Sequence, residues 1–358
     1  MGGGIFADQL APGSPNFDSF LEKTQSYIDK IIIGEGEILF YKWLSGELPG
    51  EQRVYTREDI NGEVLELSTV GIPGFSDSKI NEYPYCAAYT SRSCPFRCGF
   101  CSGIRQWGKY RKKKPGQVLE ELSQLSKNYR KHLFYFCDSL LNPTITELAE
   151  ELEKSRLSIY WEGYLRVDKT AGEIENIRLW RRTGFYRAWL GLESGSQRTL
   201  DGMDKGITIQ QTKNVVSGLA SVGIKTSALV VVGYPGETEA DFQQTLDLIG
   251  ELSADLYEVW CSPFNFFMNA QVQSDKWTKK SIPLYTGKLK DMLMLQTWTL
   301  KCEPSREESY RRMNRLTALI RESGIPMPYS LHDISQSDKR WKELHPDAVP
   351  PMIELTQL

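Results

Sequence analysis

Residues 91–101 read SRSCPFRCGFC, and their three cysteines have the spacing C-x3-C-x2-C. The stretch follows a short apolar run at residues 85–89, which is typical of a buried strand. Three thiolates on one short loop can hold three irons of a cubane cluster, whereas most iron–sulfur sites use four cysteines. If Cys94, Cys98 and Cys101 are the ligands, one iron stays open, and an open metal position is where another molecule can bind and react.

A structural zinc loop is an alternative for these cysteines. Zinc in a structural site takes four protein ligands, and the nearest downstream candidate, His132, is far along the chain. The ligand count therefore favours an iron–sulfur cluster, and unrelated thiols are the remaining alternative.

The composition excludes several classes of protein. The net charge of −3 and the pI near 5.9 disfavour a general nucleic-acid binder, and we interpret the basic run at residues 111–114 as a solvated approach to a helix. No apolar stretch approaches the roughly 20 residues that a membrane span needs, and the N-terminus lacks the features of a signal peptide. Seven cysteines, three of them clustered, indicate a reducing cytoplasm rather than a disulfide scaffold.

The middle of the chain alternates between strand-like and helix-like segments. Apolar runs typical of strands occur at residues 85–89, 132–137, 157–164, 185–192, 225–233 and 256–261. Helical spacing of apolar residues separates them at residues 118–125, 145–152, 174–180, 215–222 and 242–249. Such alternation predicts a parallel sheet with right-handed crossovers. Six β/α units fall short of the eight of a closed barrel, and the chemistry of a barrel lies at the carboxyl ends of its strands.

The cysteine loop resembles the hallmark of the radical SAM superfamily, C-x3-C-x-aromatic-C after the first strand of the barrel. Cys94, Cys98, Phe100 and Cys101 match it position by position. The resemblance implies an incomplete (β/α)6 barrel and a [4Fe–4S] cluster whose open iron binds S-adenosylmethionine (SAM). It also implies an external electron donor of the flavodoxin or ferredoxin type and reductive cleavage of SAM to methionine and a 5′-deoxyadenosyl radical.

Residues 136–142 leave the second predicted strand. Many members of the superfamily carry a polar or acidic group here that contacts the amino group of the methionine moiety, and Asp138 is the candidate because a carboxylate can pair with an ammonium group. The alternative is that Asp138 belongs to an N-cap or an Asx-turn before the next helix. Asn142 is a candidate for that cap.

Residues 191–196 (GLESGS) resemble an element whose polar groups meet the ribose or the methionyl part of SAM in relatives. Glu193 suits the ribose diol because a carboxylate can accept hydrogen bonds from both hydroxyls, and Ser194 belongs to the same element. Ser196 is a candidate N-cap for the next helix. Arg166, just past the third strand, is a candidate for the cofactor carboxylate, with a surface ion pair as the alternative.

Residues 232–238 (VGYPGET) leave the fifth predicted strand and resemble the G-x-P-G-E-T element of one large branch of the superfamily. Gly233 belongs to the turn, and Glu237 or Thr238 starts the next helix. The expected role of this element is mostly structural, as the floor near the adenine.

The N-terminal segment carries a second resemblance. An apolar strand at residues 27–33, the sequence GEGE at residues 34–37 and an apolar helix at residues 38–44 resemble the last third of the cobalamin-binding Rossmann-like domain of cobalamin-dependent radical SAM enzymes. A tail of an earlier strand is expected at residues 2–7. We therefore expect a native chain that begins further upstream, with cobalamin bound only where that full domain is present.

Four segments follow from these landmarks. Residues 1–50 are the remnant of the cobalamin-binding domain, 51–80 a linker, 81–265 the radical SAM core, and 266–358 a helical cap that sets the substrate. Helices are expected in the cap at residues 291–300 and 307–323. The aromatic stretch at residues 260–267 either lines the substrate cavity or packs in the core.

Outside the motif, Cys137, Cys261 and Cys302 are too widely spaced for an auxiliary cluster, and we expect them to be buried small hydrophobic residues. The alternative is that one of them donates a hydrogen atom or takes part covalently.

The resulting functional hypothesis is a radical SAM enzyme that functionalises an unactivated carbon of a small molecule or peptide. Its expected type is a cobalamin-dependent C-methyltransferase. The alternatives are a cobalamin-free epimerase, dehydrogenase or rearrangement enzyme, and a non-catalytic module for electron transfer or iron sensing.

Overall fold

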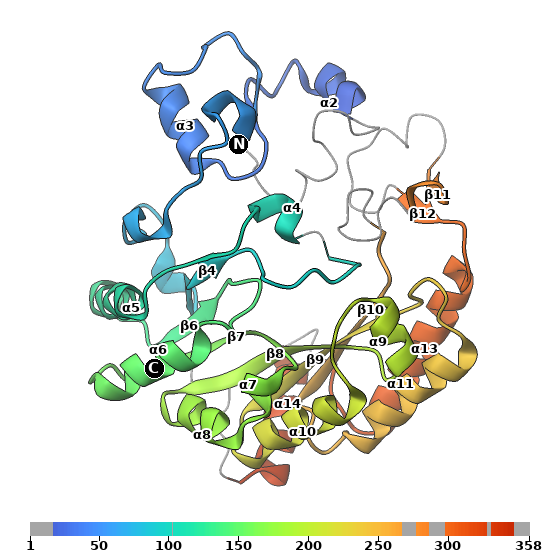
Figure 1. Cartoon of the computed structure of the whole chain (residues 1–358). Coiled ribbons are helices and arrows are strands. Elements are labelled where there is room, and N and C mark those ends of the chain that lie inside the picture. Colours follow the sequence, from blue (N-terminus) through green and yellow to red (C-terminus); the bar gives the residue numbers. More distant parts are fainter. Residues whose placement is uncertain (1–16, 102, 267–276, 286–297, 328–330, 347–358) are drawn as a thin grey trace. The chain divides into compact units, whose positions relative to one another are not determined.

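The computed structural model describes residues 17–101, 103–266, 277–285, 298–327 and 331–346 (Figure 1). The chain divides into two compact units, each treated by itself below. The loop unit takes the described parts of residues 1–69, 93–111 and 265–302, and the sheet unit takes those of residues 70–92, 112–264 and 303–358. None of the helices in the described ranges is both long and apolar enough to cross a membrane.

The sheet unit is built on six strands in the order β10-β9-β8-β7-β6-β3. Every neighbouring pair is parallel, so the predicted incomplete (β/α)6 barrel is confirmed. The strands are β3 (Cys86–Ala88), β6 (Leu133–Phe136), β7 (Tyr160–Arg166), β8 (Phe185–Glu193), β9 (Lys225–Val232) and β10 (Glu258–Pro263).

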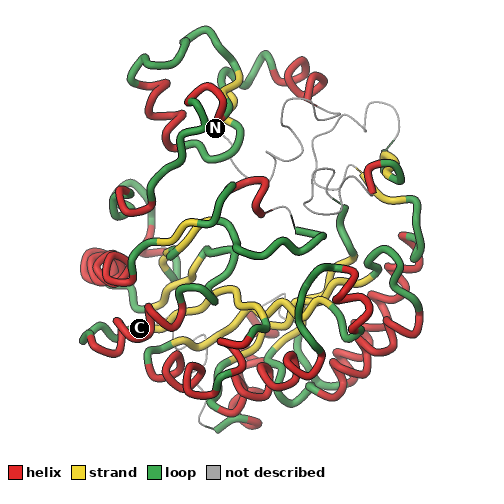
Figure 2. The backbone as a smooth tube through the Cα atoms, viewed as in Figure 1, coloured by secondary structure: helices red, strands yellow, loops and turns green. Residues whose placement is uncertain are grey.

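Helices follow the strands and lie along one face of the sheet (Figures 1 and 2). They are α5 (Pro115–Tyr129), α6 (Ile145–Lys154), α7 (Lys169–Gly172), α8 (Ile174–Arg182), α9 (Gln197–Gly202), α10 (Ile209–Ser221), α11 (Glu239–Glu251) and α13 (Arg306–Glu322), and the unit also contains α14 (Leu331–Leu344). Shorter elements are η3 (Ile80–Glu82), β4 (Ser91–Arg92) and β5 (Arg111–Lys112).

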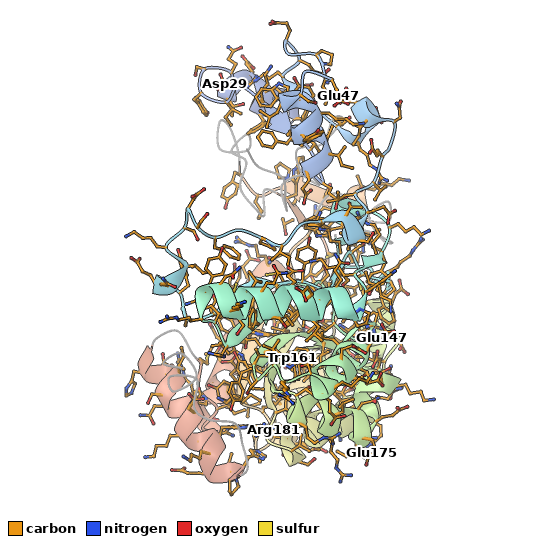
Figure 3. The ribbon with its side chains drawn as sticks, turned by 90° about the vertical axis from the view of Figure 1, so that its left-hand side faces the viewer. Asp29, Glu47, Glu147, Trp161, Glu175 and Arg181 are labelled. Carbon is orange, nitrogen blue, oxygen red and sulfur yellow. The ribbon has the colours of Figure 1, made fainter. Side chains whose placement is uncertain are left out.

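The main core lies between the sheet and these helices. Alternate strand residues point to opposite faces, and the set facing the helices is apolar. Trp161 of β7 is its centre, with ring centroids 5.5 Å from Phe136 and 4.8 Å from Phe185. In Figure 3, Trp161 lies inside the unit, whereas Glu147 and Glu175 lie on its outer helices. The opposite face of the sheet carries charged and aromatic side chains instead.

Helix α14 closes the amino-terminal ends of two strands. Lys225 Nζ at the start of β9 donates to Asp338 Oδ1 on α14 at 2.6 Å, and Tyr257 Oη donates to the same oxygen at 2.8 Å. Trp341 packs edge-on against Tyr257, with centroids 5.9 Å apart, and its Nε1 donates to Gly223 O. The carboxyl-terminal helix therefore stabilises the end of the sheet opposite to the one where barrel chemistry is expected.

The loop unit contains a small core of its own. Ile32, Leu39, Leu48, Tyr55 and Ile60 are buried against one another. The elements that carry the unit are α2 (Phe17–Thr24), β1 (Ile31–Ile32), α3 (Glu37–Leu44), β2 (Val54–Tyr55), η1 (Arg57–Ile60), η2 (Leu67–Thr69), α4 (Gly103–Trp107), β11 (Ser281–Pro283) and β12 (Trp298–Leu300). Strands β1 and β2 pair in parallel.

Several predicted elements differ from those observed. The strand expected at residues 27–33 is only the two residues of β1, and the helix expected at residues 38–44 is α3. The helix expected at residues 307–323 is α13. The helix expected at residues 291–300 is wrong at its end, because residues 298–300 form β12, antiparallel to β11; its other residues, and the strand expected at residues 2–7, lie outside the described residues.

Candidate functional site

The three motif cysteines lie on one closed loop of the loop unit. Ser93, in a left-handed conformation with φ of +72°, donates from Oγ to Gly108 O at 2.7 Å and so joins the two ends of the loop. Within it, Cys101 N donates to Cys98 O at 3.1 Å. Cys98 is buried, and Cys94 and Cys101 are partly buried. Phe100, the aromatic residue of the motif, is also partly buried.

The donor set of this loop fits an iron–sulfur cluster. Gly103 N donates to Cys101 Sγ at 3.4 Å, and such bonds to ligating sulfurs help to set the properties of a cluster. Among the described side chains, no three His, Cys, Asp or Glu groups gather as a single metal ion would need. A cubane does not require this, because its cysteines bind different irons.

A buried ion pair joins the GEGE sequence to the end of the cysteine loop. Arg111 contacts both carboxylate oxygens of Glu35, with Nη1 to Oε2 at 3.0 Å and Nη2 to Oε1 at 3.1 Å. The same guanidinium donates to Leu65 O and Trp107 O. The bidentate geometry is the strong form of an arginine–carboxylate pair, so Glu35 holds the segment that follows the cysteines.

The interpretation of residues 111–114 as a solvated basic run is therefore wrong for two of its members. Arg111 is held by Glu35, and Lys113 is 2% exposed and pairs with Glu121 at 2.6 Å. These charges are buried because each has a carboxylate partner, which lies 76 residues away in sequence for Arg111 and 8 residues away for Lys113.

Asp138, directly after β6, is buried and accepts four hydrogen bonds. Its donors are Thr90 N, at 3.1 Å to Oδ1 and 2.9 Å to Oδ2, and the hydroxyls of Thr90 and Ser91, each at 2.6 Å to Oδ1. Burial raises the pKa of this carboxyl group, against the effect of these bonds. Asp138 therefore fixes the residues that lead into the cysteine loop.

Asn142 is not the expected helix cap. The N-cap of α6 is Thr144. Asn142 instead pairs with the backbone of Arg166, accepting from its N at 2.8 Å and donating to its O at 2.9 Å. Its amide thus continues the pairing between the ends of β6 and β7, where the backbone ladder has stopped.

Glu193 ends β8 in a left-handed conformation, with φ of +62°, at a shift in the register between β8 and β9. Its Oε1 accepts from Lys205 Nζ at 2.7 Å, and both side chains are almost fully buried. A Cβ at Gly191 would lie 2.6 Å from this oxygen and 2.8 Å from Nζ, so the glycine leaves room for the pair. Strained backbone of this kind in a non-glycine residue costs on the order of 1–3 kcal/mol and concentrates at functional sites.

Arg166 ends β7 and is only 5% exposed, so the alternative of a surface ion-pair residue is wrong. Its Nη2 lies 3.6 Å from the position that a Cβ of Gly206 would take. Lys205 and Gly206 come from the short segment after α9. The sequence analysis assigned no role to Lys205, although it lies in the Met-x-Lys sequence that follows the GLESGS element.

The serines of the GLESGS element shape the loop after β8. Ser194 Oγ lies 3.2 Å from Thr245 Oγ1 and accepts from Ser196 N at 3.1 Å. Ser196 caps α9 as predicted, and its hydroxyl donates to Asp241 Oδ1 at 2.6 Å. These bonds anchor the loop to α11.

Gly233, after β9, has φ of +80° and donates from N to Glu237 Oε2 at 2.9 Å. Glu237 also accepts from Arg312 Nη1 at 2.9 Å, and burial raises the pKa of this carboxyl group. Thr238 caps α11. The carboxylate of Glu237 is thus engaged in holding the turn against α13.

The structure places Asp138, Arg166, Glu193, Ser194 and Gly233 at the carboxyl ends of four successive strands, β6 to β9, as the alternation of elements predicted. Of the cysteines expected to be buried, Cys137 is exposed, and Cys261 and Cys302 are partly buried. Cys137 differs because it lies on the face of β6 that is turned away from the helices.

The Radical SAM superfamily model matches residues 89–249. An anaerobic magnesium-protoporphyrin IX monomethyl ester cyclase of Rubrivivax gelatinosus is 32% identical over 171 residues, covering 46% of this chain and 30% of that protein. An uncharacterized methyltransferase of Pyrococcus horikoshii is 28% identical over 251 residues, covering 64% of this chain and 54% of that protein. The chain thus spans about half or less of the length of these relatives.

Two solved structures share the fold. The cobalamin-dependent S-adenosylmethionine radical enzyme OxsB, with aqua-cobalamin and S-adenosylmethionine bound, has a TM-score of 0.55 at 20% identity, covering 71% of this chain and 39% of that one. The radical S-adenosylmethionine methyltransferase TsrM from Kitasatospora setae, with a tryptophan substrate and a SAM analogue, has a TM-score of 0.58 at 14% identity, covering 78% and 62%.

Two glycines of the turn after β9 allow a matched test of its packing. Both have positive φ, but a Cβ on Gly233 would lie 2.1 Å from Ser309 Oγ, whereas one on Gly236 would contact nothing within 4 Å. We expect Gly236→Ala to lower the free energy of unfolding by about 1 kcal/mol, and Gly233→Ala by about 2 kcal/mol more because of overpacking. Urea unfolding measures both, and equal losses would contradict the close contact with α13.

Proposed function

Because the chain belongs to the radical SAM superfamily, we propose that it is an enzyme that cleaves S-adenosylmethionine reductively and uses the radical to abstract hydrogen from an unactivated carbon. The observation that carries this proposal is the closed C-x3-C-x2-C loop, which follows the first strand of a six-stranded parallel sheet. The substrate is a small molecule or a peptide.

Cys94, Cys98 and Cys101 would hold the [4Fe–4S] cluster. When bound, the cluster supplies the electron that splits SAM into methionine and a 5′-deoxyadenosyl radical, and a flavodoxin- or ferredoxin-type donor would restore that electron. The protein contributes binding, orientation and exclusion of water.

The residues at the strand ends suit the polar groups of SAM. The guanidinium of Arg166 is a fit for the methionine carboxylate. Glu193 is a fit for the ribose diol, since a carboxylate can accept hydrogen bonds from both hydroxyls and Lys205 orients this one through Oε1. Ser194 shapes the loop after β8, and Gly233 shapes the loop after β9. In this proposal Gly233 would lie near the adenine.

Asp138 is assigned a positioning role in this scheme rather than contact with the methionine amino group. Asp138 is only 1% exposed, and both of its side-chain oxygens already accept hydrogen bonds from Thr90 and Ser91. Asp138 then acts on the cofactor through the residues that precede the cysteine loop.

The first test is cleavage itself. Anaerobically reconstituted protein should bind about four irons and, with dithionite and SAM, release 5′-deoxyadenosine. The triple variant with alanine at positions 94, 98 and 101 should do neither. Iron analysis and chromatography of the nucleoside measure the two outcomes, and full iron content in the triple variant would remove the basis of the proposal. A cluster without any cleavage of SAM would favour an electron-transfer or sensing module.

The second test concerns Glu193. Loss of its hydrogen bonds to the ribose should weaken SAM binding by roughly 10- to 100-fold in Glu193→Ala, with the iron content unchanged. Glu147→Ala is the matched control, because Glu147 lies on α6 and forms an exposed ion pair with Lys112. Equilibrium dialysis with SAM measures the affinity, and an unchanged value in Glu193→Ala would leave Glu193 a purely structural role.

The finer proposal is a cobalamin-dependent methyl transfer to the substrate carbon. It is supported by the GEGE sequence, whose Glu35 holds Arg111, and by the likeness of fold to OxsB and TsrM. Cobalamin would carry the methyl group. A cobalamin-free epimerase, dehydrogenase or rearrangement enzyme is the alternative. The relative from Rubrivivax gelatinosus is named as a cyclase and not as a methyltransferase.

The products of SAM separate these two reactions. Methyl transfer consumes a methyl group of SAM and releases S-adenosylhomocysteine, whereas hydrogen abstraction alone releases only 5′-deoxyadenosine and methionine. Because cobalamin binding is expected only where the full cobalamin-binding domain is present, we expect excess hydroxocobalamin to raise the yield of S-adenosylhomocysteine from a reduced protein that contains that domain. Mass spectrometry of both nucleosides is the measurement. A yield that does not respond to hydroxocobalamin would favour the cobalamin-free alternative.

A further inference from the structure

We propose that the sheet carries a binding platform for the planar, conjugated ring of the substrate, formed by Tyr85, Tyr135, Tyr164, Trp189 and Trp260. This platform deepens the proposed function, on which it rests, by naming the chemical class on which the radical acts.

The five rings form a continuous row across the sheet. Successive ring centroids are 6.0 Å apart from Tyr85 to Tyr135, 6.5 Å to Tyr164, 5.9 Å to Trp189 and 5.7 Å to Trp260. All four distances lie in the range in which aromatic rings attract one another. The row runs across the strands from Tyr85, which directly precedes β3, to Trp260 on β10, so the parallel sheet assembles it from five separate segments of sequence.

The row lies on the face of the sheet opposite to the helices. Tyr164 alternates with Trp161 and Leu165, which belong to the helix-packed core. Tyr85 is 43% exposed, and the other four rings are partly exposed. Aromatic residues that served only the core would be expected on the helix side, where the large apolar cluster lies.

A buried ionic layer supports the row. Arg187 pairs with Glu162, its Nη1 lies 3.6 Å from Glu258 Oε1, and its guanidinium lies 4.6 Å from the ring centroid of Trp189. Burial raises the pKa of the Tyr135 hydroxyl, so this phenol stays neutral. The charge of Arg187 is thus paired with carboxylates beside the row, and the five rings, whose planes are tilted by 38° to 73° from one to the next, offer an aromatic surface that favours a conjugated ring over an aliphatic group.

The row lies just below the residues assigned to SAM. Tyr164 precedes Arg166 by two positions on β7, and Trp189 precedes Glu193 by four on β8. At about 3.3 Å per residue, these offsets are roughly 7 Å and 13 Å along the strands. A ring stacked on the platform would thus lie within the same unit as Arg166 and Glu193, one layer deeper along the strands.

The indole of Trp189 adds a separate argument. Its Nε1 is buried and has no hydrogen-bond acceptor in the described part of the chain. A phenylalanine there would avoid this unsatisfied donor. The presence of the larger indole ring at this position is accounted for if its face contributes to binding.

The test is binding of planar and saturated probes to the full chain in the absence of SAM. The probes are indole-3-propionate and coproporphyrin III, which represent a small and a large conjugated ring, and cyclohexanepropionate, which has the same acid group but no π-system. Equilibrium dialysis should show at least one planar probe binding about tenfold or more tightly than the saturated one. Equal affinities, or no binding of either planar probe, would overturn the proposal without any variant.

Variants locate the binding. Trp189→Leu and Tyr164→Leu should each lower the affinity for the planar probe by about tenfold or more. Trp189→Phe, which keeps a ring, should lower it by no more than about threefold. Tyr310→Leu, on the outer helix α13, is the matched control and should change nothing. Circular dichroism identifies variants that do not fold. If Trp189→Leu and Tyr164→Leu fold correctly and bind the planar probe as tightly as the wild type, the assignment is overturned. Failure of the proposed function would appear separately, as a wild-type protein that does not cleave SAM.

Discussion

The buried carboxylate of Asp138 is the interaction on which the functional edge of the sheet depends. It lies directly after β6 and takes its hydrogen bonds from Thr90 and Ser91, which follow β3. In the sequence, Ser93, where the cysteine loop begins, comes two residues after Ser91. Burial raises the pKa of this carboxyl group, and the hydrogen bonds that it accepts reduce the shift without cancelling it.

Side chains that hydrogen-bond to free backbone groups also occur at the ends of other strands. The backbone ladder stops where a parallel strand leaves the sheet, and the freed donors and acceptors need side-chain partners. Asn142 pairs with the backbone of Arg166, and Glu237 accepts from Gly233 N while it binds Arg312. Glu193 differs, because its partner is the side chain of Lys205 and its own backbone is strained. A strained, buried carboxylate at this edge is what the proposed contact with the ribose requires.

The sequence was sufficient for the six strands, their parallel order and the strand ends that carry polar groups. The strands and their parallel arrangement follow from local apolar runs and helical spacing, and the polar groups at the strand ends were recognised through the resemblance to a known family. It was not sufficient for Glu35–Arg111 or for Asn142, because these side chains find partners through chain segments that no periodicity relates. The motif at residues 91–101 was recognisable for the opposite reason, since three ligands within one loop need no distant partner. The helix expected at residues 291–300 shows how little a short apolar pattern decides, because its last residues pair as a strand.

The row of aromatic rings also could not be predicted from local sequence patterns, because it joins distant segments of the chain. Each ring is one residue of a strand-like run, and in sequence it reads as part of the core. Only the register, which sets Tyr164 against Trp189 on the neighbouring strand, turns them into a surface. The alternation of strand side chains then divides the work between two faces of one sheet: apolar residues such as Trp161 hold the helices, and the opposite face is left for rings and paired charges. The proposed platform thus lies on the face of the sheet that does not pack against the helices.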